Sequence, residues 1–138
     1  MWEYEHAVDS TAAPQRIWTV WVDVPNWPAW NAGVEKAAIE GPFAPGTRFT
    51  MTPPGEEPIA MVLADVVPHE RFTDIMDAGD FVVTTVHRLE PLPSGGTRVV
   101  YRTEITGPAA AQIGPQLGPA ITADFPVVLA ALVLRAEG

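Results

Sequence analysis

The feature that most constrains the fold is an almost uncharged C-terminal segment, Ala109 to Ala136, which follows a series of strand-like segments. A helix that is apolar nearly all round is buried on more than one side. We therefore expect a long C-terminal helix inside the fold, opened by Pro119 and kinked at Pro126, where proline removes a backbone hydrogen bond. One face of this helix carries Ile121, Phe125, Val128, Leu129 and Leu132, and the other still shows Val127, Ala130 and Val133.

The N-terminal part of the chain predicts one strand and two helical pieces. Apolar and polar residues alternate from Trp2 to Asp9, which is typical of a strand with one wet face. Ser10 or Thr11 is placed to cap a helix that Pro14 opens. The following stretch, Asp23 to Asn31, contains two prolines and predicts a turn or a short second helix.

Six further strands are expected between this region and the C-terminal helix. Their short connections imply antiparallel neighbours. The fold class that follows is α+β, with a curved antiparallel sheet of six to seven strands wrapped around the long helix and residues 1–138 forming a single domain. Because a curved sheet is wider than one helix, an apolar cavity is expected between them. The six segments are Val34 to Glu40, Thr47 to Thr52, Ile59 to Val67, Phe72 to Met76, Phe81 to Glu90 and Thr97 to Thr106.

Charge and composition exclude several classes of function. The formal net charge of −9 disfavours binding to nucleic acid and to anionic membranes. The chain has no cysteine, which removes disulfides and thiolate chemistry and fits a cytoplasmic protein, and its first residues do not resemble a signal peptide. The three histidines do not show metal-ligand spacing, and no phosphate-binding loop or nucleophile elbow is present, so we expect no metal and no cofactor.

Several motifs nevertheless resemble a known family. The first motif is the run Ala12-Ala13-Pro14, which is followed by Ile17-Trp18 and by Trp27-Pro28-Ala29-Trp30-Asn31. The pattern continues in Gly41 to Thr47, in Glu90-Pro91 with Gly95 to Val99, and in Ile105 to Pro108. The chain resembles polyketide cyclase/dehydrase-like proteins of the START and birch-pollen-allergen-like superfamily, which has the helix-grip fold. The resemblance implies a hydrophobic pocket between the sheet and the C-terminal helix. It implies no catalytic motif, and a fold alone does not define a function.

The most informative polar residue is His87. Strand alternation places it on the inward face of its strand, between Thr85 and Leu89, with Tyr101 at or near the paired position on the next strand. An inward His beside a Tyr can hydrogen-bond a ligand or act as an acid and base. The alternative is a neutral core histidine satisfied by nearby hydroxyls, and structure or ligand binding is favoured over catalysis.

Aromatic and methionine side chains supply the remaining candidate ligand contacts. Trp18 and Trp27 are assigned to the pocket and Trp30 to the core, while methionines suit a plastic pocket wall. No catalytic residue is assigned. The full set of candidate ligand-binding residues is Trp18, Trp27, Phe49, Met51, Met61, Phe72, Met76, Thr85, His87, Leu89, Tyr101, Thr103, Phe125 and Leu129.

Two classes of function remain open, and a third is less favoured. The first is a protein that binds a small hydrophobic or amphipathic molecule, such as a lipid, a polyketide or an aromatic metabolite. The second is a cyclase or aromatase that orients a reactive ligand in the same cavity. An acid or Arg reaching the ligand would favour chemistry over binding. The third is a stress or chaperone-cofactor module. The uncharged stretch Ile105 to Ala123 also leads us to expect a homodimer.

Overall fold

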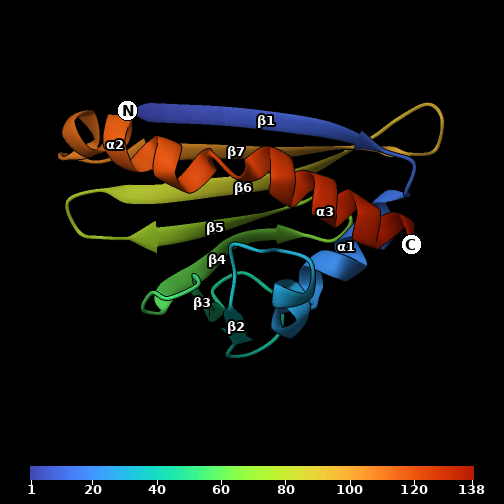
Figure 1. The fold of residues 1–138 in the computed structure, drawn as a ribbon, viewed down its shortest axis with the longest axis horizontal. Coiled ribbons are helices and arrows are strands. Elements are labelled where there is room, and N and C mark those ends of the chain that lie inside the picture. Colours follow the sequence, from blue (N-terminus) through green and yellow to red (C-terminus); the bar gives the residue numbers. More distant parts are fainter.

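The computed structural model describes residues 1–138 as one curved antiparallel sheet with helices on its concave side (Figure 1). The expected helix-grip architecture is confirmed. The strands are β1 (Trp2–Ser10), β2 (Lys36–Ile39), β3 (Arg48–Thr52), β4 (Ile59–Val67), β5 (Arg71–Asp77), β6 (Val82–Pro91) and β7 (Thr97–Thr106). The helices are α1 (Pro14–Val22), the 3-10 helix η1 (Val24–Ala29), α2 (Ala110–Thr122) and α3 (Phe125–Glu137).

The sheet has the order β1-β7-β6-β5-β4-β3-β2, so the first strand pairs with the last. All other neighbours are consecutive in sequence, as their short connections predict. The expected strand bounds agree with the observed ones to within two residues. The largest difference is in β2, which begins at Lys36 because the backbone N–H of Val34 is used in a turn with Asn31.

The C-terminal helical region is divided differently from the expectation. Pro119 does not open the main helix but lies inside α2. The break falls at Ala123 and Asp124, so that Pro126 occupies the first turn of α3, where a missing N–H costs nothing. Neither Ser10 nor Thr11 caps α1, whose N-cap is Ala13 without a side-chain hydrogen bond.

Ser10 instead joins the end of β1 to the end of α3. Its hydroxyl donates to the carboxylate of Glu137 at 2.8 Å, and the backbone N–H of Thr11 donates to the same group. Arg16 of α1 donates to the carbonyl of Ala136. These contacts fix the C-terminal end of α3 against the start of α1, and they set the position of the helix across the sheet.

Helix α2 sits unusually close to β1 because it presents glycine where it meets Trp2. A Cβ on Gly114 would lie 2.6 Å from the Cβ of Trp2, and a Cβ on Gly118 would overlap the indole ring. Glycine is unfavourable in a helix interior. Here it allows the helix to pack directly on the tryptophan, in a small cluster with Val83 and Ile105.

Helix α3 is buried on one side only, contrary to the expectation of burial on more than one. Leu129 and Leu132 are fully buried in the main core, whereas Val127 and Leu134 are 66% and 74% exposed. The helical stretch Ala110–Glu137 has the length and the apolar composition of a membrane-spanning helix. In this fold, 33% of its apolar 18-residue window is buried inside the protein. Its position on the concave face of the sheet is seen in Figure 1.

Candidate functional site

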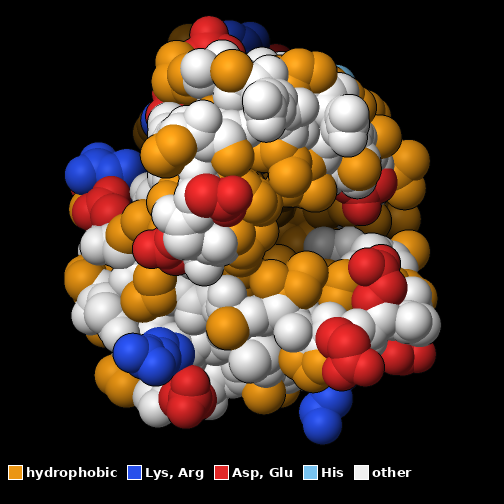
Figure 2. All heavy atoms as spheres, turned by 90° about the vertical axis from the view of Figure 1, so that its left-hand side faces the viewer, with side chains coloured by type: hydrophobic (Ala, Val, Ile, Leu, Met, Phe, Trp, Pro, Cys, Tyr) orange, Lys and Arg blue, Asp and Glu red, His pale blue; other side chains and the backbone are white.

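A cavity of about 530 Å³ lies between the concave face of the sheet and the helices. Its walls come from β3 to β7, from the end of α1, from α2 and the start of α3, and from η1 and the loop after it. Figure 2 looks into the hollow, whose interior is mainly hydrophobic. The residues that line it are Trp21, Trp27, Trp30, Asn31, Gly33, Val34, Met51, Pro53, Pro54, Glu56, Ile59, Met61, Phe72, Asp74, Met76, Val83, Thr85, His87, Tyr101, Leu117, Ala120, Ile121, Asp124, Phe125 and Val128.

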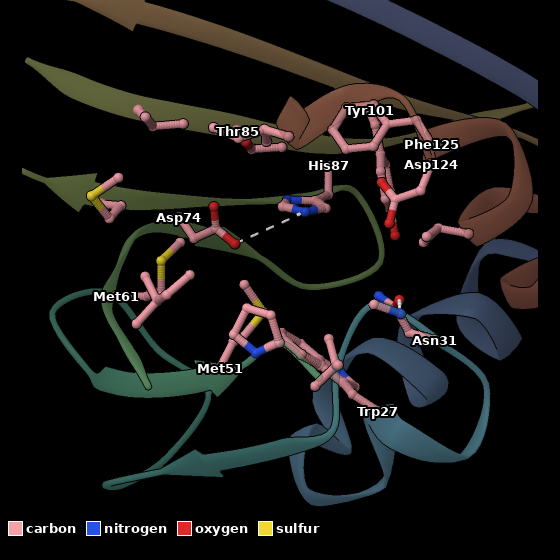
Figure 3. A pocket seen from close by; sticks show the side chains of 18 of the residues that line it. Trp27, Asn31, Met51, Met61, Asp74, Thr85, His87, Tyr101, Asp124 and Phe125 are labelled. Atoms are coloured by element: carbon pink, nitrogen blue, oxygen red, sulfur yellow. Dashed lines mark hydrogen bonds and ion pairs between the residues drawn. The ribbon is translucent and has the colours of Figure 1, made fainter. Parts of the chain in front are cut away.

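The structure brings together most of the residues that the sequence assigned to a pocket. Strand alternation is the reason, because it puts every second residue of β3 to β7 on the concave face. Those that line the cavity are Trp27, Met51, Met61, Phe72, Met76, Thr85, His87, Tyr101 and Phe125. The close view in Figure 3 shows many of them around one space, with Met51 and Met61 on the opposite side from His87.

Five assigned residues lie in the surrounding core and do not line the cavity. Trp18 packs edge-on against Trp21 and Phe72, on the far side of these rings. Phe49 is covered by the ring of Trp27. The other three, Leu89, Thr103 and Leu129, are at most 5% exposed and pack among neighbouring core residues.

Two further tryptophans line the cavity. Trp30 was expected in the core but is half-buried and lines the cavity. Trp21 was not assigned, and its fully buried ring forms part of the cavity wall. Helical spacing alone did not distinguish Trp18 from Trp21, because both lie on the buried side of α1.

The most important residue that the assignment missed is Asp74, in the middle of β5. It is 5% exposed, and it lies on the cavity face between Phe72 and Met76. Both neighbours had been assigned inward, so the alternation of the strand predicts the same direction for Asp74. The signal was present in the sequence, but acidic residues are almost never fully buried, which favours an outward position.

His87 of β6 is the direct cross-strand partner of Phe72, diagonal to Asp74, and it stacks on the ring of Phe72 at a centroid distance of 3.9 Å. Its Nδ1 lies 3.2 Å from the carbonyl oxygen of Phe72. A carbonyl can only accept, so Nδ1 carries the proton and the lone pair is on Nε2. Burial lowers the pKa of His87 to about 3, so the ring is neutral at pH 7.

The unprotonated nitrogen of His87 points toward Asp74. Nε2 and the nearer carboxyl oxygen of Asp74 are 4.0 Å apart, which is too long for a hydrogen bond (dashed line in Figure 3). Burial raises the pKa of Asp74 to about 7, and no hydrogen bond or positive charge offsets it. At neutral pH both the acid and the carboxylate are therefore populated.

Hydroxyl groups complete the polar part of the wall. The indole N–H of Trp21 donates to the hydroxyl of Tyr101 at 3.1 Å, which leaves the phenolic proton free to donate. Burial raises the pKa of Tyr101, so this proton is retained at neutral pH. The hydroxyls of Thr85 and Thr103 bind each other at 2.9 Å, and this pair is satisfied without a ligand.

The helix break supplies the remaining polar wall. Asp124 lies there, and partial burial raises the pKa of its carboxyl. Across from it, the side chain of Asn31 accepts a hydrogen bond from the N–H of Gly33. A Cβ on Gly33 would lie 2.9 Å from the Asp124 carboxylate, so glycine permits this close approach. Figure 3 shows the side chains of Asn31 and Asp124 pointing toward each other at one end of the cavity.

Comparison with known proteins places this geometry in a family. Among solved structures, the chain is similar to Ara h 8.0201, with 14% identity, coverage of 98% of this chain and 97% of the other, and a TM-score of 0.78. It is similar to a START superfamily protein from Mycobacterium smegmatis, with 15% identity, 98% and 97% coverage, and a TM-score of 0.75.

A third similar structure is the di-domain ARO/CYC StfQ from the steffimycin biosynthetic pathway, with 17% identity and a TM-score of 0.76. The match covers 98% of this chain and 50% of StfQ. A search among curated proteins found no match. The family model described as polyketide cyclase/dehydrase and lipid transport matches residues 1–137. The chain therefore belongs to the polyketide cyclase/dehydrase and lipid transport family.

Proposed function

We propose that this protein binds one small, largely apolar molecule in the cavity between the sheet and α2–α3. The observation that carries the proposal is a cavity of about 530 Å³ whose mainly apolar wall includes a few convergent polar groups. Small-molecule sites typically have 300–1,000 Å³ and this composition. Its polar groups, His87, Asp74 and Tyr101, come from three adjacent strands and orient the ligand by hydrogen bonds.

The binding proposal is tested by filling the cavity from the helix side. Ile121 of α2 lines the cavity, so Ile121→Trp should occupy part of it. The matched control is Gln112→Trp, which adds the same ring to an exposed position of α2 away from the cavity. We expect the neutral fluorescent probe N-phenyl-1-naphthylamine to bind the wild type and the control, and to bind Ile121→Trp at least ~10-fold more weakly. Equal binding by all three folded proteins would refute the proposal.

A second candidate function, cyclase-type proton transfer, is favoured by one observation. Asp74 is a buried acid whose pKa of about 7 lies near the working pH, and it faces a neutral imidazole, which suits general acid–base chemistry. In this reaction the Asp74 carboxylate takes a proton from the carbon next to a ligand carbonyl. The electron pair of the broken C–H bond moves to the carbonyl oxygen and gives an enolate, which can then attack a second carbonyl.

Proton transfer is measured by hydrogen–deuterium exchange into a bicyclic ketone such as 2-tetralone in D₂O. If this function is real, the wild type accelerates exchange, and Asp74→Asn lowers the acceleration by ~100-fold or more while the ketone still binds. His87→Phe separates the roles of the histidine. A loss of affinity of roughly 0.5–1.5 kcal/mol indicates ligand orientation, and a ~100-fold loss of exchange indicates acid–base participation. No acceleration by the wild type would remove this candidate.

We further propose that the protein acts in the cytoplasm and self-associates as a dimer. The outer surface of the C-terminal helices supports the second point, because Val127 and Leu134 are 66% and 74% exposed. Sedimentation velocity at high concentration should show a dimer that Leu134→Glu dissociates. A monomeric wild type at high concentration would contradict the proposal.

A further inference from the structure

The polar end of the cavity holds two acceptors to which no protein group donates, while the free phenolic proton of Tyr101 bonds to neither of them. The lone pair of His87 Nε2 and the carboxyl group of Asp74 face the same space, 4.0 Å apart. Asp74 is 5% exposed, and the only cause that shifts its pKa is desolvation, with no contribution from a hydrogen bond. A buried carboxyl group without a partner is costly, so a group bound here should supply what the protein does not.

The charges of the cavity wall have one sign. Glu56, Asp74 and Asp124 line it, and no Lys or Arg does. Thr85 is the direct cross-strand partner of Asp74 on β6, and the titratable groups that interact with Asp74, His87 on β6 and Tyr101 on β7, are both uncharged at pH 7. In Figure 2, acidic side chains flank the hollow on both sides, while the Lys and Arg side chains lie toward the outer edges of this face. Such a wall repels a carboxylate or phosphate and attracts a cation.

Aromatic rings form much of the rest of the wall. Trp21, Trp27, Trp30, Phe72 and Tyr101 all contribute to it. The faces of such rings attract cations, and the effect is larger where water is excluded. The ring system therefore accommodates both the apolar body of a ligand and a positive charge beside it.

We propose that the cavity selects a hydrophobic amine, whose ammonium group donates hydrogen bonds to both Asp74 and His87 Nε2. This inference rests on the proposed binding function and names its ligand class. An ammonium has three donors and no acceptor, so it satisfies both acceptors at once. A ligand carbonyl would satisfy only the protonated form of Asp74 and leave Nε2 without a donor. A ligand hydroxyl can bridge the two groups, but it gains nothing from the negative wall.

The test uses three probes with one ring system and different polar ends: 2-(1-naphthyl)ethylamine, 2-(1-naphthyl)ethanol and 1-naphthylacetate. Each competes with N-phenyl-1-naphthylamine at pH 7.5. We expect the amine to displace the probe at concentrations at least ~10-fold lower than the alcohol, and the carboxylate to be the weakest. Asp74→Asn should remove the preference, so that the amine and the alcohol displace the probe at similar concentrations. The control Asp65→Asn makes the same charge change on the exposed side of β4 and should preserve the preference.

A measurement on the unmodified protein gives an independent check. Asp74 is partly protonated at pH 7, so binding of an ammonium beside it should release a proton from the carboxyl group. Calorimetric titrations at pH 7 in phosphate and in Tris should show net proton release for the amine and none for the alcohol.

Each result has a definite meaning. A wild type that binds the alcohol or the carboxylate as tightly as the amine overturns the inference, and so does an amine preference that survives in Asp74→Asn. Amine binding without proton release also contradicts it. If neither N-phenyl-1-naphthylamine nor any of the three probes binds, the proposed function itself fails, which is a distinguishable outcome.

Discussion

Replacing Asp74 by Asn should make the protein more stable at neutral and alkaline pH and leave its stability nearly unchanged in acid. The folded protein raises the pKa of this carboxyl from 3.8 to about 7. Between these pH values the folded state binds more protons than the unfolded state, so the free energy of unfolding of the wild type falls as pH rises. Asn has nearly the same shape and cannot ionise.

The magnitude follows from the width of this pH interval. One pH unit corresponds to 1.36 kcal/mol per proton, so the interval from 3.8 to about 7 is worth on the order of 4 kcal/mol. The stability of Asp74→Asn relative to wild type should therefore increase by about this amount between pH 4 and pH 8. His87 acts in the opposite direction: its pKa is lowered from 6.5 to about 3, so it makes the protein less stable as pH falls through this range. The two effects oppose each other in the wild type, and Asp74→Asn removes one of them.

Urea unfolding followed by tryptophan fluorescence, at pH values from 4 to 8, measures the effect. Asp80→Asn is the matched control, because Asp80 is an exposed aspartate in the turn after β5. Its stability difference from wild type should not change by more than a few tenths of a kcal/mol over the same range. A difference between Asp74→Asn and wild type that is independent of pH would mean that Asp74 ionises as it does in water, and the reasoning on the cavity wall would be refuted.

Three further predictions concern the packing and the hydrogen bonds of the elements that surround the cavity. Gly118→Ala should lower the free energy of unfolding by ~1–3 kcal/mol, because the added methyl group overlaps Trp2; in a Trp2→Ala background the loss should disappear, and chemical denaturation measures both. Thr85→Val should cost ~1–3 kcal/mol by leaving the Thr103 hydroxyl without its partner, whereas the double replacement of both by Val should cost less than the single change. Truncation before Ala120 should abolish the cooperative thermal transition in calorimetry, because it removes all of α3 from the core; a sharp transition would contradict this.

The sheet was predictable because its signals are local. Period-two alternation and proline–glycine turns placed β4 and β7 without error, and they put His87 opposite Tyr101 in the observed register. The same alternation put the cavity-facing residues of β5 and β6 on one face. The family resemblance added the helix grip, which the order of elements also favoured.

The helical region was harder to predict because its pattern is ambiguous. Pro119 has the same local signature whether it opens a helix or lies within one, and in the structure it lies within α2, next to the Gly118 that packs on Trp2. Asp74 was missed for a related reason, since burial of an acid contradicts the usual preference of its residue type. Which of Trp18 and Trp21 reaches the cavity depends on the rotation of α1 against the sheet, and this is set by tertiary contacts.

The most direct test of ligand binding in the cavity uses the methyl groups of methionine as reporters. The chain has four methionines: Met51, Met61 and Met76 line the cavity, and Met1 is 73% exposed outside it. NMR spectra of methyl-labelled protein should be recorded with and without saturating N-phenyl-1-naphthylamine. Ligand binding in the cavity predicts large ring-current shifts and intermolecular contacts for the three cavity methyls and none for Met1. Binding of the probe with unchanged cavity methyls would place the ligand on another surface and contradict binding in the cavity.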